Sequence, residues 1–277
     1  MKSLKRTLDK FYNDFDFGER LLHDPIEFPH RYSDPGDIEV SGFIASCLAY
    51  GRVELFKSVV ERILALMGDH PSSFLMDFDV RKQRRLFSFK YRFNETEDIL
   101  CLLFILHKIL RNRSSLEGAF MRYYAPDDPH TGSALAGFVN EVMSLNTSPV
   151  YGKNIHPPGM TQLFPSPVKG SACKRMNLFL RWMVREKDID FGIWKGIPGN
   201  KLVIPLDTHI ARIARCLGLT RRTSADWKTA LEITEALKKL DPDDPLKYDF
   251  ALCHHGISGM CAKGDTRLCQ GCNLSIF

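Results

Sequence analysis

The spacing of apolar residues constrains the fold of this chain more than any other feature. Apolar side chains recur every three or four residues through much of the sequence, which is the period of an amphipathic α-helix. No stretch shows the strict alternation of a half-buried strand, and no segment is repeated. The helical period is clearest in residues 38–49, 53–67, 97–111, 172–185, 208–217 and 226–239. The sequence therefore predicts an all-α protein.

One long stretch interrupts the helical period. Residues 146–170 (NTSPVYGKNIHPPGMTQLFPSPVKG) are rich in Pro, Gly and Ser. A stretch of this length without periodicity is usually a functional loop or a boundary between domains. A chain of 277 residues is long enough for one large core or two modest ones. We therefore predict two helical lobes, residues 1–150 and residues 151–277, the second of which ends in a cysteine-rich tail.

Neither the most apolar run nor the first residues of the chain indicate a membrane protein. Residues 99–106 (ILCLLFIL) are too few to cross a bilayer. The opening MKSLKRTLDKFYNDF mixes charged and apolar residues and lacks the apolar core of a signal peptide. We therefore expect a cytoplasmic protein without membrane association. In that compartment, eight cysteines favour a metal or redox role over disulfides.

Positive charge gathers in the predicted second lobe. The whole chain carries a net charge of +5, whereas residues 165–222 contain twelve Lys or Arg against four Asp or Glu, a balance of +8. The remainder therefore carries 5 − 8 = −3. A basic segment on a slightly acidic protein is typical of phosphate or nucleic-acid binding, although a solvated basic surface has the same composition.

A turn of small residues precedes the helix predicted over residues 172–185. Gly170, Ser171 and Ala172 form a turn whose backbone N–H groups are free to meet a phosphate. Lys174 follows in the first helical turn, where the positive end of the helix dipole disfavours a protonated amine. Lys174 is therefore a candidate nucleophile. The alternative is an ordinary lysine on a solvated helix face.

A carboxylate stands at the start of the helix predicted over residues 208–217. Asp207 directly follows an apolar run, residues 202–206, in which Pro205 is the one interruption. As an N-cap, Asp207 would stabilise the positive end of the helix. A carboxylate held rigidly among basic residues is also positioned for chemistry on an anionic partner. Both roles are compatible with one side chain.

Four cysteines lie close together near the end of the sequence. Cys253, Cys261, Cys269 and Cys272 have the spacing C-x7-C-x7-C-x2-C. In a cytosolic protein such a group indicates a 4Fe–4S cluster or zinc, with His254 or His255 as a replacement ligand. A metal would fix this loop and bring Lys263 and Arg267 within reach of a phosphate. The alternative is a tail that has lost its metal.

The order of these features resembles the helix-hairpin-helix DNA glycosylases of the endonuclease III type. Gly170, Ala172 and Lys174 fall on the two glycines and the catalytic lysine of that superfamily's hairpin, and Asp207 falls on its catalytic carboxylate. The phrases KRMNLFLRWMVR and PLDTH are most similar to an uncharacterised bacterial family within the superfamily.

The sequence departs from the superfamily pattern at several positions. Ala172 replaces the second hairpin glycine, and residues 188–199 form an inserted loop. Ala49 or Tyr50 stands where endonuclease III has a glutamine that probes the duplex. After the His-Gly pair at residues 255–256, three cysteines follow instead of four.

The resemblance implies a DNA repair glycosylase with AP-lyase activity that removes a damaged, oxidised base. Lys174 would form a Schiff base with the sugar, and Asp207 would stabilise the positive charge that develops there. A monomer would bind double-stranded DNA and extrude the base, with Tyr50, Trp182 or Trp194 as a stacking wall unless these rings lie in the core. The residues expected to contact DNA are Lys169, Gly170, Ala172, Arg175, Arg212, Arg215 and Tyr50. Two alternatives remain: a DNA-binding protein without catalysis, and a metal-dependent enzyme organised by Cys253, His255 and Cys261.

Overall fold

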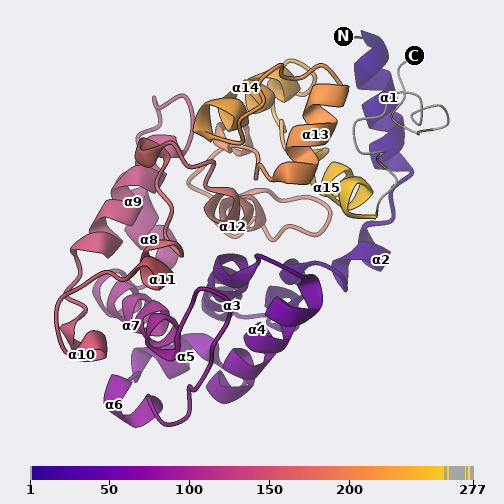
Figure 1. Cartoon of the computed structure of the whole chain (residues 1–277). Coiled ribbons are helices and arrows are strands. Elements are labelled where there is room, and N and C mark those ends of the chain that lie inside the picture. Colours follow the sequence, from indigo (N-terminus) through magenta and orange to yellow (C-terminus); the bar gives the residue numbers. More distant parts are fainter. Residues whose placement is uncertain (1, 259–260, 262–271, 273, 275–277) are drawn as a thin grey trace. The chain divides into compact units, whose positions relative to one another are not determined.

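The computed structural model describes residues 2–258, 261, 272 and 274. Within these residues every regular element is a helix (Figure 1). The β-type pairings of the described chain are two isolated bridges, one between Tyr91 and Asn94 and one between Ser171 and Asp226. The predicted all-α class is therefore confirmed.

The chain forms two compact units, and neither is continuous in sequence. The terminal unit comprises residues 1–20, 129–131 and 167–277, and the central unit comprises residues 21–128 and 132–166. The lobe expected over residues 1–150 thus does not coincide with a compact unit. Two short helices of the Pro- and Gly-rich stretch pack on a long helix of the central unit, whereas the end of the stretch, from residue 167, and residues 1–20 belong with the C-terminal part of the chain.

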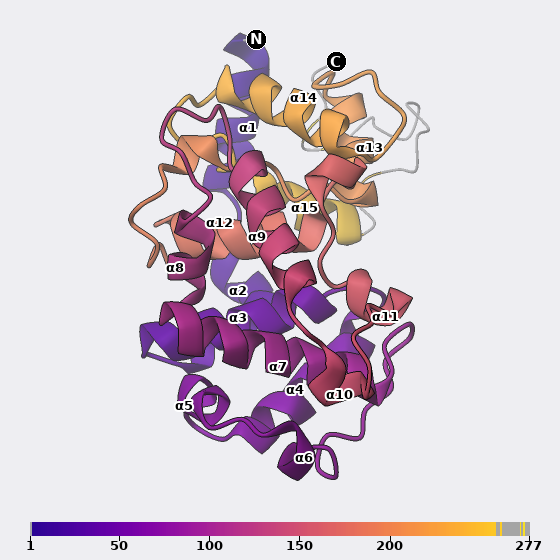
Figure 2. The same ribbon diagram turned by 90° about the vertical axis from the view of Figure 1, so that its left-hand side faces the viewer.

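The central unit is built around two buried helices. Helix α7 (Thr96–Arg113) packs against most of the short helices of the unit, and α3 (Pro35–Leu48) is buried over nearly its whole length. A helix that is apolar all round needs such neighbours to cover it. Figure 2 shows these helices together. The other helices of the unit are η1 (Pro25–Glu27), η2 (Pro29–Arg31), α4 (Val53–Met67), α5 (Pro71–Met76), α6 (Val80–Gln83), α8 (Leu116–Met121), α9 (Gly132–Ser144), α10 (Ser148–Tyr151) and α11 (Pro158–Thr161).

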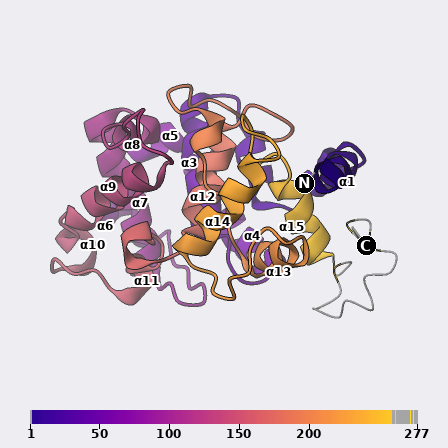
Figure 3. The same ribbon diagram turned by 90° about the horizontal axis from the view of Figure 1, so that it is seen from above.

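The terminal unit contains the helices that carry the predicted catalytic residues. Helix α13 (Thr208–Cys216) packs along α15 (Asp249–Ile257) (Figure 3). Trp182 is fully buried, and Trp194 is buried edge-on against Phe179, so both tryptophans are core residues rather than a stacking wall. The other helices of the unit are α1 (Lys2–Asn13), η3 (Pro167–Lys169), α12 (Lys174–Val184), η4 (Gly199–Lys201) and α14 (Trp227–Lys238), while α2 (Phe17–Leu21) lies where the chain passes from one unit to the other.

No helix in the described part of the chain combines the length and the apolar character that a membrane span requires. Residues 99–106 lie inside α7, where all of them are buried. This apolar run is therefore part of a core helix.

Candidate functional site

The turn before α12 is anchored to the start of α14. The carbonyl of Gly170 accepts a hydrogen bond from the Trp227 N–H at 3.0 Å, and Ser171 forms its bridge with Asp226. Gly170 has a φ of +78°, which glycine adopts without strain, and the space around its Cα is open. A single 3-10 turn, η3, precedes this turn where the helix-hairpin-helix pattern would have an α-helix, so that motif is not confirmed.

Lys174 is the first residue of α12, and its side chain is partly exposed. The residue before it, Cys173, adopts a left-handed conformation with a φ of +50°, and its side chain does not cap the helix. A helix start that lacks a side-chain cap presents backbone N–H groups to an anion. The structure therefore places a lysine amine at a helix end of the kind that binds phosphate.

Asp207 is the N-cap of α13, as the sequence predicts. Its Oδ1 accepts hydrogen bonds from the N–H groups of His209 and Ile210, both at 2.9 Å. Its Oδ2 faces the Sγ of Cys253 at 3.8 Å. The apolar run before it is buried, and the Ile204 N–H donates to Thr234 Oγ1. The backbone on both sides of Asp207 is thus fixed, while Oδ2 is held by no backbone donor from the part of the chain that the structure describes.

A second carboxylate lies near Asp207, and sequence reasoning missed it. Asp249 opens α15, is buried, and accepts a hydrogen bond from Arg181 Nη1 at 2.6 Å. Burial raises the pKa of Asp249 to about 6, and the charge of Asp207 adds to the rise although Arg181 opposes it. Two carboxylates with different environments therefore occur at the starts of α13 and α15.

Two arginines of the basic segment belong to a buried ionic network. Arg181 donates to Asp190 at 3.2 Å, and both side chains are almost fully buried. Arg185 is held by Asp188 at 2.7 Å, by Asp190 at 3.0 Å and by Asp244 at 3.0 Å. The loop expected as an insertion, residues 188–199, supplies two of these partners. The charge of +8 therefore overstates the basic surface, because both guanidinium groups are compensated inside the protein.

The residues expected to contact DNA have different surroundings. Lys169, Gly170 and Arg215 are exposed, and Arg175 is partly exposed. Ala172 is buried, and its carbonyl accepts a hydrogen bond from Asn177 Nδ2 at 3.1 Å. Lys169, Arg215 and the turn at Gly170 are therefore accessible to a phosphate backbone.

The interactions of Arg212, Lys174 and Tyr50 show which of the predicted site residues lie together. Arg212 donates to the carbonyl of Gly256 at 3.2 Å and to Cys261 Sγ at 3.4 Å, so it links α13 to the residues after α15. Within the described residues, Lys174 and Asp207 form no ion pair with one another. Tyr50 lies in the central unit, where its hydroxyl donates to Asn94 Oδ1.

The predicted metal ligands are described in part. Cys253 lies inside α15 beside Asp207, and Cys272 Sγ lies 3.7 Å from His255 Nε2. Burial and the charge of Arg212 lower the pKa of His255. Cys269, with Lys263 and Arg267, lies outside the described residues. Among the residues that the structure describes, no three potential ligands converge on one point, so the metal site stays a prediction.

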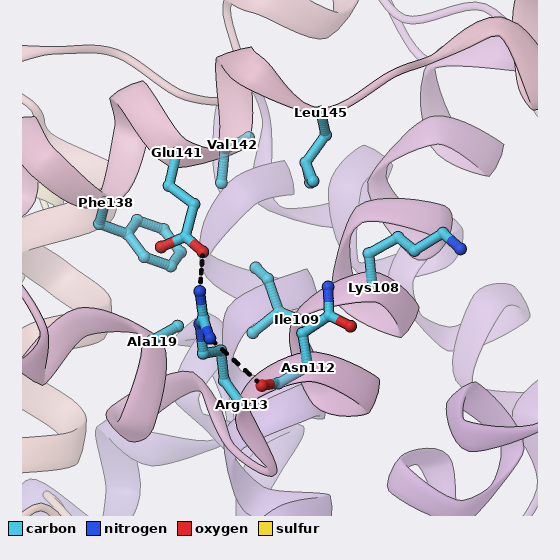
Figure 4. A pocket seen from close by; sticks show the side chains of 9 residues that line it. All are labelled: Lys108, Ile109, Asn112, Arg113, Ala119, Phe138, Glu141, Val142 and Leu145. Carbon is cyan, nitrogen blue, oxygen red and sulfur yellow. Dashed lines mark hydrogen bonds and ion pairs between the residues drawn. The ribbon is translucent and has the colours of Figure 1, made fainter.

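Figure 4 shows a pocket of the central unit, formed by α7, α8 and α9. Glu141 accepts a hydrogen bond from Arg113 Nη2 at 3.2 Å at its edge. The free space inside this pocket is about 10 Å³, which suits a single water molecule and excludes a nucleobase. This pocket is therefore not a substrate site.

The fold and these side chains define an all-α protein of two helical units, each discontinuous in sequence, with a lysine at one helix start and a carboxylate at another. The chain belongs to the DUF2400 family, whose model matches residues 24–258 and is described as a protein of unknown function. This match overturns the assignment to the helix-hairpin-helix glycosylase superfamily, which rested on short phrases around Lys174 and Asp207. No curated protein and no solved structure matches the chain.

Proposed function

We propose that this protein is a DNA repair enzyme that removes a damaged, oxidised base from double-stranded DNA and then cleaves the strand as an AP lyase. The observation that carries the proposal is the position of Asp207, whose Oδ1 is held by two backbone N–H groups while its Oδ2 faces the Cys253 thiol and, among the described residues, is bound by no backbone donor. A carboxylate fixed in this way is preorganised to stabilise a developing positive charge. The family to which the protein belongs has no assigned activity, so the proposal rests on the residues of the site alone.

The chemistry divides between Asp207 and Lys174. Breaking an N-glycosidic bond leaves positive charge on the sugar, which the Asp207 carboxylate would stabilise. The neutral amine of Lys174 would form a bond to C1′ while the base departs with the electron pair of the broken bond and takes up a proton. Ring opening gives a Schiff base, loss of a C2′ proton expels the 3′-phosphate, and water then releases the lysine.

Binding of the duplex would use the open turn and the cations around it. The start of α12 lacks a side-chain cap, and the same unit holds the exposed Lys169, five residues before this start, and the exposed Arg215 on α13. Such groups position a phosphate backbone without reading its sequence. In this proposal the protein acts as a monomer in the cytoplasm, with DNA as its partner.

We also propose that the tail binds a metal, as zinc or a 4Fe–4S cluster. The Sγ of Cys272 and the Nε2 of His255 are 3.7 Å apart. Two ligands of one tetrahedral zinc ion, with bonds of about 2.3 Å to sulfur and about 2.0 Å to nitrogen, are separated by roughly this distance. The thiol of Cys253 faces Asp207 instead, which favours His255 over Cys253 beside Cys261, Cys269 and Cys272.

A second candidate function is DNA binding without catalysis. It is favoured by the lack of an ion pair between Lys174 and Asp207 within the described residues, because Asp207 then has a sufficient role as a helix cap and Lys174 is an ordinary, partly exposed lysine. Incubation with duplexes that carry single oxidised bases, in the presence of borohydride, separates the two functions. A covalent adduct together with release of the base supports the enzyme. Tight binding of every duplex without adduct or release supports the binding protein.

A further inference from the structure

An aromatic ring stands exposed at the tip of a tight turn in the central unit. Tyr91 and Asn94 close the turn with two backbone hydrogen bonds of 2.9 and 2.8 Å, which leaves Arg92 and Phe93 at its tip. Phe93 is 66% exposed, although phenylalanine is usually buried. Its ring lies almost parallel to that of Tyr50, with 12° between the planes and 6.4 Å between the centroids.

Arg92 completes this surface. Its guanidinium lies 5.6 Å from the centroid of Phe93 and 5.9 Å from that of Tyr50. Gly51 makes room for it, because a Cβ at that position would meet the Arg92 side chain. The φ of Arg92 is +53°, a left-handed conformation that is uncommon for a residue with a side chain. We call Tyr50, Arg92 and Phe93 the stacking platform.

A buried polar network holds the platform in place. The Tyr50 hydroxyl donates to Asn94 Oδ1 at 2.5 Å, and the fully buried Asn94 donates to the carbonyl of Gly159 at 2.6 Å. Gln162 donates to Asn94 Oδ1 at 3.1 Å. The Tyr91 hydroxyl also donates to the carbonyl of Tyr50. The exposed ring therefore rests on a rigid base, so little conformational entropy is lost when a ligand binds to it.

The chain that leads to the platform is strongly basic. Residues 80–93 (VRKQRRLFSFKYRF) contain six Lys or Arg and no Asp or Glu. Arg84 pairs with Glu97 and Lys90 pairs with Glu95. Within the described residues, the other four make no salt bridge and all are exposed. These four are Arg81, Lys82, Arg85 and Arg92. The platform thus follows, in sequence, cations that have no carboxylate partner among the described residues.

We propose that the stacking platform binds single-stranded nucleic acid, with an unpaired base stacked on Phe93 and the backbone phosphates on Arg81, Lys82 and Arg85. Proteins bind unpaired bases without reading their sequence by combining exposed aromatic rings, on which the bases stack, with basic side chains that contact the phosphates. An acidic peptide would use the cations but would not need the exposed ring. A lipid surface would require Arg92, which lies over the rings, to enter an apolar layer at high cost. This inference concerns the central unit and depends on neither Lys174 nor Asp207.

Affinity for a lesion-free single-stranded oligonucleotide that carries 2-aminopurine tests the proposal. Binding should quench the 2-aminopurine fluorescence through stacking. Phe93→Ala should weaken binding by about tenfold and abolish the quenching, since stacking on one ring contributes about 1–3 kcal/mol. Phe93→Trp should restore both. Arg85→Ala should lower the slope of log affinity against log salt by nearly one unit while the quenching persists.

Leu86→Ala is the matched control, because Leu86 is also an exposed apolar residue of this segment, 58% exposed, but lies outside the platform. It should leave affinity and quenching unchanged. The proposal is overturned if Phe93→Ala binds the oligonucleotide as tightly as the wild type. It is equally overturned if the Phe93 variant loses binding only to vesicles that contain phosphatidylserine. If the wild type forms no borohydride adduct but binds the single-stranded oligonucleotide as expected, the proposed enzyme activity is contradicted and the platform proposal still holds.

Discussion

Gly256 of α15 packs directly against His209 of α13. A Cβ at position 256 would lie 2.7 Å from the His209 Cβ, closer than two such atoms approach in proteins. The carbonyl of Gly256 also accepts a hydrogen bond from Arg212 on α13. The close approach of Gly256 to His209 therefore fixes how tightly α13, which begins after Asp207, packs on α15.

Replacing Gly256 by alanine should therefore force the two helices apart. We expect a loss of about 1–3 kcal/mol in the free energy of unfolding, as for other overpacked sites, together with reduced base release. Urea unfolding measures the first effect. Gly199→Ala is the control, since the nearest atom to its Cβ would be the Asp243 carbonyl oxygen at 3.6 Å, an ordinary contact. Equal stability of the Gly256 variant and the wild type would show that α13 and α15 are not held this closely.

The pKa of Asp249 makes the stability of the protein depend on pH. Burial raises this pKa from 3.8 to about 6, so between these values the folded state binds a proton that the unfolded state releases. The contribution to stability is complete below about pH 4 and is lost as the pH rises through about 6, by about 3 kcal/mol. Asp249→Asn lacks this titration, and its stability should therefore rise relative to the wild type between pH 4 and pH 7. Parallel curves for the two proteins would exclude a raised pKa at Asp249.

The tail prediction is tested by metal content. Protein purified without oxygen should contain about one zinc ion or one 4Fe–4S cluster per chain. Cys272→Ser and His255→Asn should each lower the content strongly, because each removes a ligand. Cys216→Ser is the matched control, since Cys216 is an exposed cysteine at the end of α13. A metal content that is zero in the wild type, with normal stability and activity, would refute the prediction.

The two roles of Asp207 separate in the variant Asp207→Asn. Asparagine keeps an oxygen that caps the helix, so stability should fall by no more than about 1 kcal/mol. The loss of negative charge should slow base release by about 100- to 1000-fold. Asp34→Asn is the control, because Asp34 caps α3 through the Gly36 and Asp37 N–H groups in the same pattern. If both variants turn over normally, Asp207 is a cap and nothing more.

The helices that bury one face were predictable from sequence, because the spacing of apolar residues records that face directly. The segments predicted over residues 53–67 and 208–217 appear as α4 and α13 within one residue at each end. Asp207 as an N-cap was predictable for a similar reason, since capping is local in sequence.

Features that depend on distant contacts were not predictable in this way. A count of charges cannot distinguish the buried Arg181 and Arg185 from surface cations, because their partners Asp190 and Asp244 reach them only in the folded chain. The joining of α1 to the C-terminal part likewise depends on a long-range contact, in which Asp9 accepts hydrogen bonds from Lys247 and Tyr248. The family assignment failed because the resemblance was dense in a few short phrases.

The central claim is that the amine of Lys174 attacks the sugar, and borohydride trapping of the variant Lys174→Gln tests it most directly. The wild type should give a covalent adduct with a duplex that carries an oxidised base, and Lys174→Gln should give none while it binds the duplex with nearly unchanged affinity. Lys228→Gln, which removes an exposed lysine of α14, should trap as the wild type does. Trapping that persists in the Lys174 variant would contradict the account, because another amine would then be the nucleophile.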